Sequence, residues 1–164
     1  MNKLAENQAV ARGRDLPIST KKSIDVCRHV KGRTLKSAKE QLQRVLDMKN
    51  AVAATAHRKD IPHRPGFMAG GRYPQIATKK ILEVIELAEK NAQNKGLNVN
   101  SLIIKNIRAD KAANPMRGGR QGRHKTKRTH IEVIVEEQLQ KKEDKKAPAK
   151  KTAKKETAKE ETTQ

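Results

Sequence analysis

Cys27 and His29 are the first residues of this chain that could do covalent chemistry, as a thiol nucleophile and its base. Side chains two positions apart on a helix point about 200° away from each other around the axis, so this pair could not meet there. Ile24, Cys27 and Val30 recur at helical spacing and form one apolar face. The pattern therefore predicts a buried structural cysteine.

His57 and His63 are the next candidates, because histidine is a common metal ligand and the two flank Arg58-Lys59-Asp60. The neighbouring cations and the single cysteine of the chain argue against a metal site, and contact with RNA or solvent is the favoured interpretation. The sequence also contains no phosphate-binding glycine loop and no paired carboxylates at the end of an apolar strand; Glu132 and Glu136 share one strand face, where we expect them to balance neighbouring lysines. We therefore expect no enzyme activity, no metal and no cofactor.

The charge of the chain points to a different kind of chemistry. Its 38 Lys and Arg against 18 Asp and Glu give a formal charge of +20, which favours a polyanionic partner. Nucleic acid is the first choice and an anionic membrane surface the second, although no apolar run reaches the roughly 20 residues of a membrane span. With Phe67 and Tyr73 as the only aromatic residues, base stacking is poorly supported, and recognition of phosphates and of folded nucleic-acid shape is favoured.

The location is predicted from two further features. The N-terminal residues MNKLAENQAVARGRD lack the apolar stretch of a signal peptide. Cys27 has no second cysteine with which to form an internal disulfide. Both favour the cytoplasm.

The elements that must position these residues can be read from apolar periodicity. A short extended segment over 9–14 ends at Asp15-Leu16-Pro17, and a helix follows with Ser19 as N-cap and Gly32 as its stop. A second helix begins after the N-cap candidate Thr34. A basic loop then runs from His57 to Gly71, and a longer helix opens at Pro74 as its first position and closes at Gly96.

Residues 101–107 and 129–136 change to β-branched, alternating patterns and predict two strands of a hairpin. The segment between them, 108–128, carries eight Lys and Arg against Asp110 alone and is nearly devoid of core residues. Because nothing in it can pack against the domain, we expect it to be mobile in the free protein and ordered on its partner. Its glycines allow close approach to RNA; a flexible linker is the alternative, which the flanking strands disfavour.

The C-terminal segment 138–164 is a Lys/Ala/Glu-rich low-complexity tail that we expect to be disordered or transiently helical. It contributes a net charge of +4 and leaves +16 on residues 1–137. A basic tail therefore does not explain the charge of the chain. The expected division is one domain over 1–137 followed by this tail.

Three segments together carry a resemblance to a known family: GRDLPISTKKSIDVCRHVKGRTL, GGRYPQIATKKILEVIELAEKNAQNKGL and KRTHIEVIVEE. They resemble the L-twenty-two family of large-subunit ribosomal proteins (seventeen in eukaryotic naming), over roughly residues 8–137. The RYP entry to the long helix resembles its archaeal and eukaryotic branch, and the short chain favours the archaeal type.

The resemblance implies an α+β fold in which three helices pack on a small antiparallel sheet and a long β-hairpin, about 101–137, protrudes. It implies a structural role in the large ribosomal subunit, with the globular part near the opening of the peptide exit tunnel and the hairpin on the tunnel wall. The implied partners are several domains of large-subunit rRNA, neighbouring ribosomal proteins and the nascent peptide. A DNA-binding regulatory protein and an RNA-modifying enzyme are the alternatives.

The residues expected to bind rRNA are mostly cations of the basic loop, of the first strand and helix, and of the hairpin. They are Arg12, Arg14, Lys21, Lys22, Arg58, His63, Arg64, Arg72, Tyr73, Arg108, Lys111, Arg117, Arg120, Arg123, Lys125, Lys127 and Arg128. The expected tunnel-lining tip is Met116, Arg117, Gly118, Gly119 and Arg120.

Overall fold

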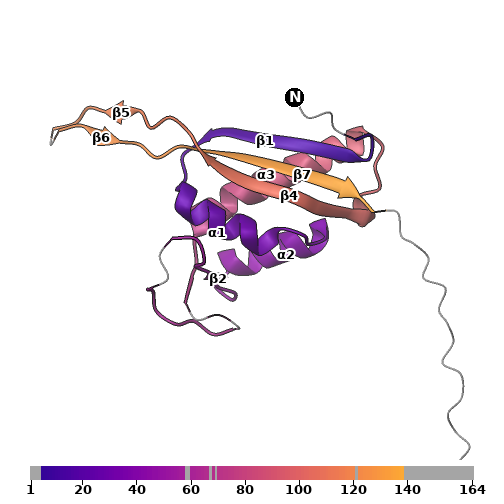
Figure 1. Ribbon diagram of the computed structural model, residues 1–164, viewed down its shortest axis with the longest axis horizontal. Coiled ribbons are helices and arrows are strands. Elements are labelled where there is room, and N and C mark those ends of the chain that lie inside the picture. The colour runs from indigo at the N-terminus through magenta and orange to yellow at the C-terminus, as the bar shows by residue number, and fades with distance from the viewer. Residues whose placement is uncertain (1–4, 58–59, 67, 69, 121, 139–164) are drawn as a thin grey trace, which may run out of the picture.

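The computed structural model describes residues 5–57, 60–66, 68, 70–120 and 122–138 (Figure 1). The predicted tail lies outside these residues from position 139 onward. Three helices pack on one face of an antiparallel three-stranded sheet, and a two-stranded extension leaves the sheet at one end. The predicted α+β class, with its three helices and protruding hairpin, is confirmed.

The sheet has the order β1-β7-β4, so the last strand of the chain, β7 (Thr129–Glu137), lies between β1 (Gln8–Leu16) and β4 (Leu102–Lys111). In the register, Val133 lies opposite both Ala11 and Ile107. Alternate residues of β7 are buried under the helices, as the period of two requires, whereas the alternation in β4 shifts at a bulge between Ile104 and Asn106. None of the described helices covers the other face of the sheet, and most of the charged side chains of the three strands lie on that face.

The first two helices, α1 (Thr20–Val30) and α2 (Leu35–Leu46), begin where predicted, but their caps differ. Thr34 caps α2 with its side chain, which accepts a hydrogen bond from the Ser37 N–H. Ser19 precedes α1 without a side-chain cap; its carbonyl accepts from both the N–H and the hydroxyl of Ser23 instead. Gly32 ends the first helix with φ of +78°, the left-handed conformation that glycine adopts without strain.

The longest helix, α3 (Gln75–Asn94), crosses β1 and β7 and buries Ile81, Val84, Ile85 and Ala88 against them. Pro74, expected at the first helical position, is the residue before it, and its carbonyl accepts from the Thr78 N–H. Gly13 allows β1 to approach this helix, because a Cβ there would lie 2.8 Å from Val84 Cγ2.

Short elements complete the chain. A two-stranded ribbon of β2 (Val52–Ala53) and β3 (Gly71–Arg72) closes the basic loop, and the 3-10 turn η1 (Val99–Ser101) leads into β4. The strands β5 (Met116–Arg117) and β6 (His124–Lys125) pair within the extension. The sequence pattern predicts the end of the first hairpin strand at Ile107, which is four residues too early. Ala109 continues the burial under the helices, while Arg108 and Asp110 occupy the open face.

Candidate nucleic-acid interface

The extension, here called the arm (residues 112–128), is the most exposed basic part of the described chain. It contains six Lys and Arg and no Asp or Glu. Ala112 is buried, and beyond it none of the described residues from 113 to 128 is. Met116 pairs with Lys125 and Arg117 with His124, and the Gly122 N–H donates to the Gly119 carbonyl across the tip. The cations and backbone groups of such an arm are accessible to a partner, and few of its contacts with its own domain stabilise it.

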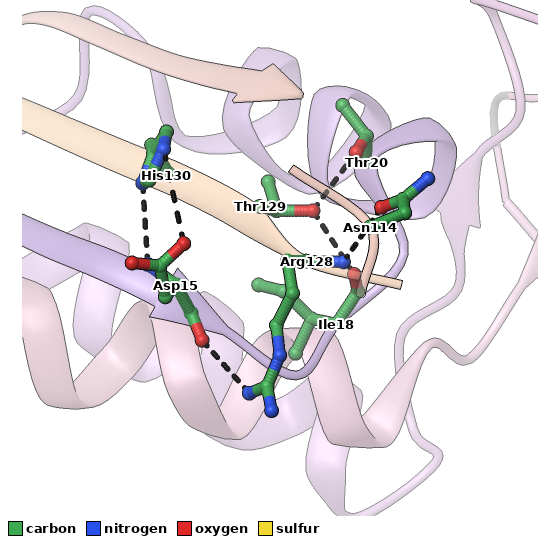
Figure 2. A network of polar contacts seen from close by, with 7 residues as sticks. All are labelled: Asp15, Ile18, Thr20, Asn114, Arg128, Thr129 and His130. Carbon is green, nitrogen blue, oxygen red and sulfur yellow. Dashed lines mark hydrogen bonds and ion pairs between the residues drawn. The ribbon is translucent and has the colours of Figure 1, made fainter. Parts of the chain in front are cut away.

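The root of the arm is tied to the segment that joins β1 and α1 (Figure 2). The Thr129 hydroxyl donates to the Ile18 carbonyl at 2.9 Å and lies 2.9 Å from the Thr20 hydroxyl. Arg128 Nη1 donates to the Asp15 carbonyl at 3.0 Å, and the Arg128 N–H donates to Asn114 Oδ1 at 3.3 Å. The bonds to Ile18 and Asp15 link residues more than 100 positions apart in sequence, so the alternating pattern of the strand alone could not reveal them.

Two of the expected rRNA contacts, Arg12 and Arg108, are engaged within the protein. They are the cross-strand neighbours of Glu132 on either side, and each places its Nε 2.7 Å from one carboxylate oxygen. The three residues line part of a hollow of about 420 Å³ on the helix-free face. Glu132 was expected to balance lysines and instead balances these two arginines. Arg108 Nε also lies 3.4 Å from Asp110 Oδ2, so two carboxylates balance the two arginines, whose side chains are still about 60% exposed.

Glu136, on the same face of β7, does pair with a lysine. Lys105 Nζ lies 3.0 Å from its Oε1, and this hydrogen bond, followed by one from Gln8, lowers the pKa of the Glu136 carboxyl. Two rows of the open sheet face are therefore held by cross-strand ion pairs. The surplus cations of the protein lie outside these rows.

The basic loop forms a second exposed cationic surface. Arg64 stacks over Tyr73 with its guanidinium carbon 5.7 Å from the ring centroid, and both His63 and Arg72 are exposed. Arg58 lies outside the described residues. Asp25 of α1, which the sequence did not single out, fixes the start of the loop, because its Oδ1 accepts from the N–H and hydroxyl of Thr55 and from the Ala56 N–H.

The remaining expected contacts are exposed cations on three elements. Arg14 lies on β1, Lys21 and Lys22 lie on the first turn of α1, and Lys111 ends β4. The structure therefore does not bring all expected contacts into one patch. The described ones divide between the arm, the loop and the body of the domain.

Cys27 is buried in the core, and burial raises the pKa of its thiol to about 12. The thiol therefore stays protonated at neutral pH, and the neutral side chain packs in the core as a small apolar residue. His29 projects elsewhere on α1, and burial together with Arg33 lowers the pKa of its ring. The pair has the properties of packed side chains.

Neither a metal site nor a membrane span is found in the part of the chain that the structure describes. Among those residues, no group of three or more His, Cys, Asp or Glu is placed so that it could hold a metal ion. No described helix is long and apolar enough to cross a membrane.

Comparison with known proteins shows the class to which this fold and its basic arm belong. Residues 11–136 match the family model described as "Ribosomal protein L22p/L17e". The chain belongs to this family of ribosomal proteins, as its sequence resemblance indicated.

Three archaeal relatives, each named "Large ribosomal subunit protein uL22", illustrate the similarity. The protein of Methanococcus vannielii is 41% identical over 136 residues, which cover 79% of this chain and 89% of the relative. That of Methanopyrus kandleri is 43% identical over 141 residues, or 80% and 88% of the two chains. That of Nanoarchaeum equitans is 38% identical over 150 residues, or 87% and 86%. The archaeal type is thereby confirmed.

Proposed function

We propose that this chain is a structural constituent of the large ribosomal subunit that binds rRNA and supports assembly of the subunit. The observation that carries the proposal is the arm, which projects from a complete domain with six cations, no acid and, after Ala112, no buried residue among those described. Such a segment gains its ordering energy from a partner, and phosphates are the natural partners of clustered arginines.

The remaining details of the proposal follow from family membership and from the arrangement of the two basic surfaces. The body would lie near the opening of the peptide exit tunnel, beside other large-subunit proteins. The arm would pass through rRNA and present its tip, Met116 to Arg120, to the tunnel and the nascent peptide. This role requires no catalytic residue and places the chain in the cytoplasm, on the ribosome. Residues 1–137 would form the ribosomal domain, and 138–164 would be its Lys/Ala/Glu-rich low-complexity tail.

The loop and the arm tip should contribute differently to rRNA binding. The loop lies beside the body and would anchor it, whereas the tip would meet RNA late and line a cavity. Replacing Arg58, Arg64 and Arg72 with Ala should weaken binding to an rRNA fragment and flatten its salt dependence, by about one counterion for each phosphate that is no longer neutralised. Replacing Arg117, Arg120 and Arg123 should change initial affinity less and should alter stalling by tunnel-sensitive nascent peptides.

A matched control removes the same charge from exposed cations outside both surfaces, at Lys36, Arg44 and Lys90. Affinity across a salt series and stalling on assembled ribosomes would be measured for all three variants. Equal decreases of affinity in all three would show that only net charge matters. A tip variant as weak as the loop variant, with unchanged stalling, would refute the division of labour.

A further inference from the structure

The root of the arm contains a buried hydrogen-bond chain whose direction can be assigned. Thr129 is 0% exposed and has one hydroxyl proton, which it donates to the Ile18 carbonyl. The 2.9 Å contact between the Thr20 and Thr129 hydroxyls must therefore have Thr20 as its donor. A buried hydroxyl that both donates and accepts fixes its side chain in one orientation. The first residue of β7 is thereby tied to the entrance of α1.

A second tie acts at the surface of the same root. The register of β1 shifts between Gly13 and Leu16, and Asp15 within this bulge has φ of +51°. The bulge turns the Asp15 carbonyl to Arg128 Nη1 and its N–H to His130 Nδ1, at 3.0 and 3.2 Å (Figure 2). An irregular and strained strand end is retained where it serves a defined geometry. Here the bulge at Asp15 binds Arg128 and His130, the two residues on either side of Thr129.

The two strands of the arm are also tied to each other at this level. The Ala112 N–H donates to the Arg128 carbonyl at 3.1 Å, and Asn114 Oδ1 accepts from the Arg128 N–H. Further out, the Thr126 N–H donates to the Pro115 carbonyl at 2.9 Å. Both strands therefore leave the domain as one ribbon, and β1 and α1 hold that ribbon at its base.

We propose that Thr129, Thr20 and Arg128 are positioning residues that lock the direction of the arm in the free protein. The arm then meets RNA as an aimed ribbon, and binding orders only its outer part. The mobility expected for the whole of 108–128 is thereby restricted to the residues beyond Asn114 and Thr126. The inference rests on the proposed function, since a fixed direction of the arm matters only if the arm binds a partner such as rRNA.

The test measures the direction of the arm without any partner. Nitroxide labels would be placed at Ala113→Cys on the tied part of the arm and at Glu86→Cys on the exposed face of α3, in a Cys27→Ala background. Ala113 is exposed, so a label there follows the direction of the ribbon without the mobility of the outer part of the arm. Pulsed electron paramagnetic resonance then gives the distribution of distances between the two labels in the full chain.

Thr129→Val removes the central hydroxyl and keeps the shape of the side chain. Thr129→Ser restores the hydroxyl. The matched control is Thr78→Val, because Thr78 is also 0% exposed and its hydroxyl has no hydrogen-bond partner within the described chain. Arg128→Gln breaks the surface tie at an incompletely buried position and serves if Thr129→Val fails to fold.

The parent, Thr129→Ser and Thr78→Val should give one narrow distribution, and Thr129→Val and Arg128→Gln should broaden it about twofold. Exchange of the Ala112 and Arg128 amide protons should accelerate about tenfold in Thr129→Val and remain unchanged in Thr78→Val. A parent distribution as broad as that of Thr129→Val would overturn the proposal. So would a narrow distribution in the folded Thr129→Val variant, or in Arg128→Gln if Thr129→Val does not fold.

Incorporation of the unlabelled parent into large subunits is measured separately. Failure to incorporate would refute the proposed function. The distance distributions would still show whether Thr129, Thr20 and Arg128 fix the direction of the arm. If both hold, Thr129→Val should bind its rRNA fragment about threefold to tenfold more weakly with an unchanged salt slope, because fewer molecules have the competent arm direction.

Discussion

Deleting residues 113–127 and joining Ala112 to Arg128 through an Asn-Gly turn should leave a folded domain that binds its rRNA fragment more weakly and with a lower salt dependence, while the basic loop still anchors it. The junction suits a two-residue hairpin, since Lys111 pairs with Thr129 and the Ala112 N–H already donates to the Arg128 carbonyl. None of the described residues in the deleted segment is buried, so the core is unaffected. The unfolding midpoint should therefore change by no more than about 3 °C.

The weaker binding follows from charge. The deletion removes five cations, and the slope of log affinity against log salt should fall by up to about four units, in proportion to the number of phosphates that these cations neutralise. Filter binding across a salt series measures this slope. A control that keeps the arm and changes these five cations to Gln should reproduce the lower slope. A deletion variant with parental affinity would show that the arm makes no phosphate contact in the complex with the rRNA fragment.

Ile85→Ala should lower the free energy of unfolding by about 2–5 kcal/mol, the cost of truncating a large side chain inside a core. Ile85 is 0% exposed on α3, which packs across β1 and β7. Its truncation leaves a cavity in the close-packed core. Against a typical total stability of about 5–15 kcal/mol, this decrease should lower the thermal midpoint by roughly 10 °C or more.

Ile76→Ala is the matched control on the same helix. Ile76 is 74% exposed, so the same truncation should cost less than about 0.5 kcal/mol. Urea denaturation of both variants, with unchanged slopes, gives the two differences directly. Similar costs at the two positions would mean that α3 does not pack on the sheet as described.

Local sequence patterns were sufficient to predict most elements of the fold. The sequence placed the longest helix between Pro74 and Gly96, and α3 spans Gln75–Asn94, with Gly96 beyond its end at φ of +76°. Patterns failed where local and long-range interactions compete. They stopped the hairpin strand at Ile107 because charged residues follow, although these lie on the helix-free face.

The sequence predicted which segments form the basic interface, but it did not predict the contacts that their side chains make. The arm could be identified from its arginines and glycines alone. The engagement of Arg12 and Arg108 by Glu132 could not, because it depends on the order β1-β7-β4, in which β7 separates the two arginine-bearing strands. The same holds for Thr129, whose partners lie at the start of α1. Contacts between distant segments have no periodic signature.

Photo-crosslinking from the arm on assembled ribosomes tests the central claim most directly. A photoreactive amino acid would replace Met116 on the arm or Met48 at the end of α2, which are 58% and 60% exposed and so equally accessible in the free protein. On ribosomes that carry a labelled, stalled nascent chain, position 116 should crosslink to both large-subunit rRNA and the nascent chain, and position 48 should not reach the nascent chain. Absence of both crosslinks at position 116, in ribosomes shown to contain the protein, would contradict the account.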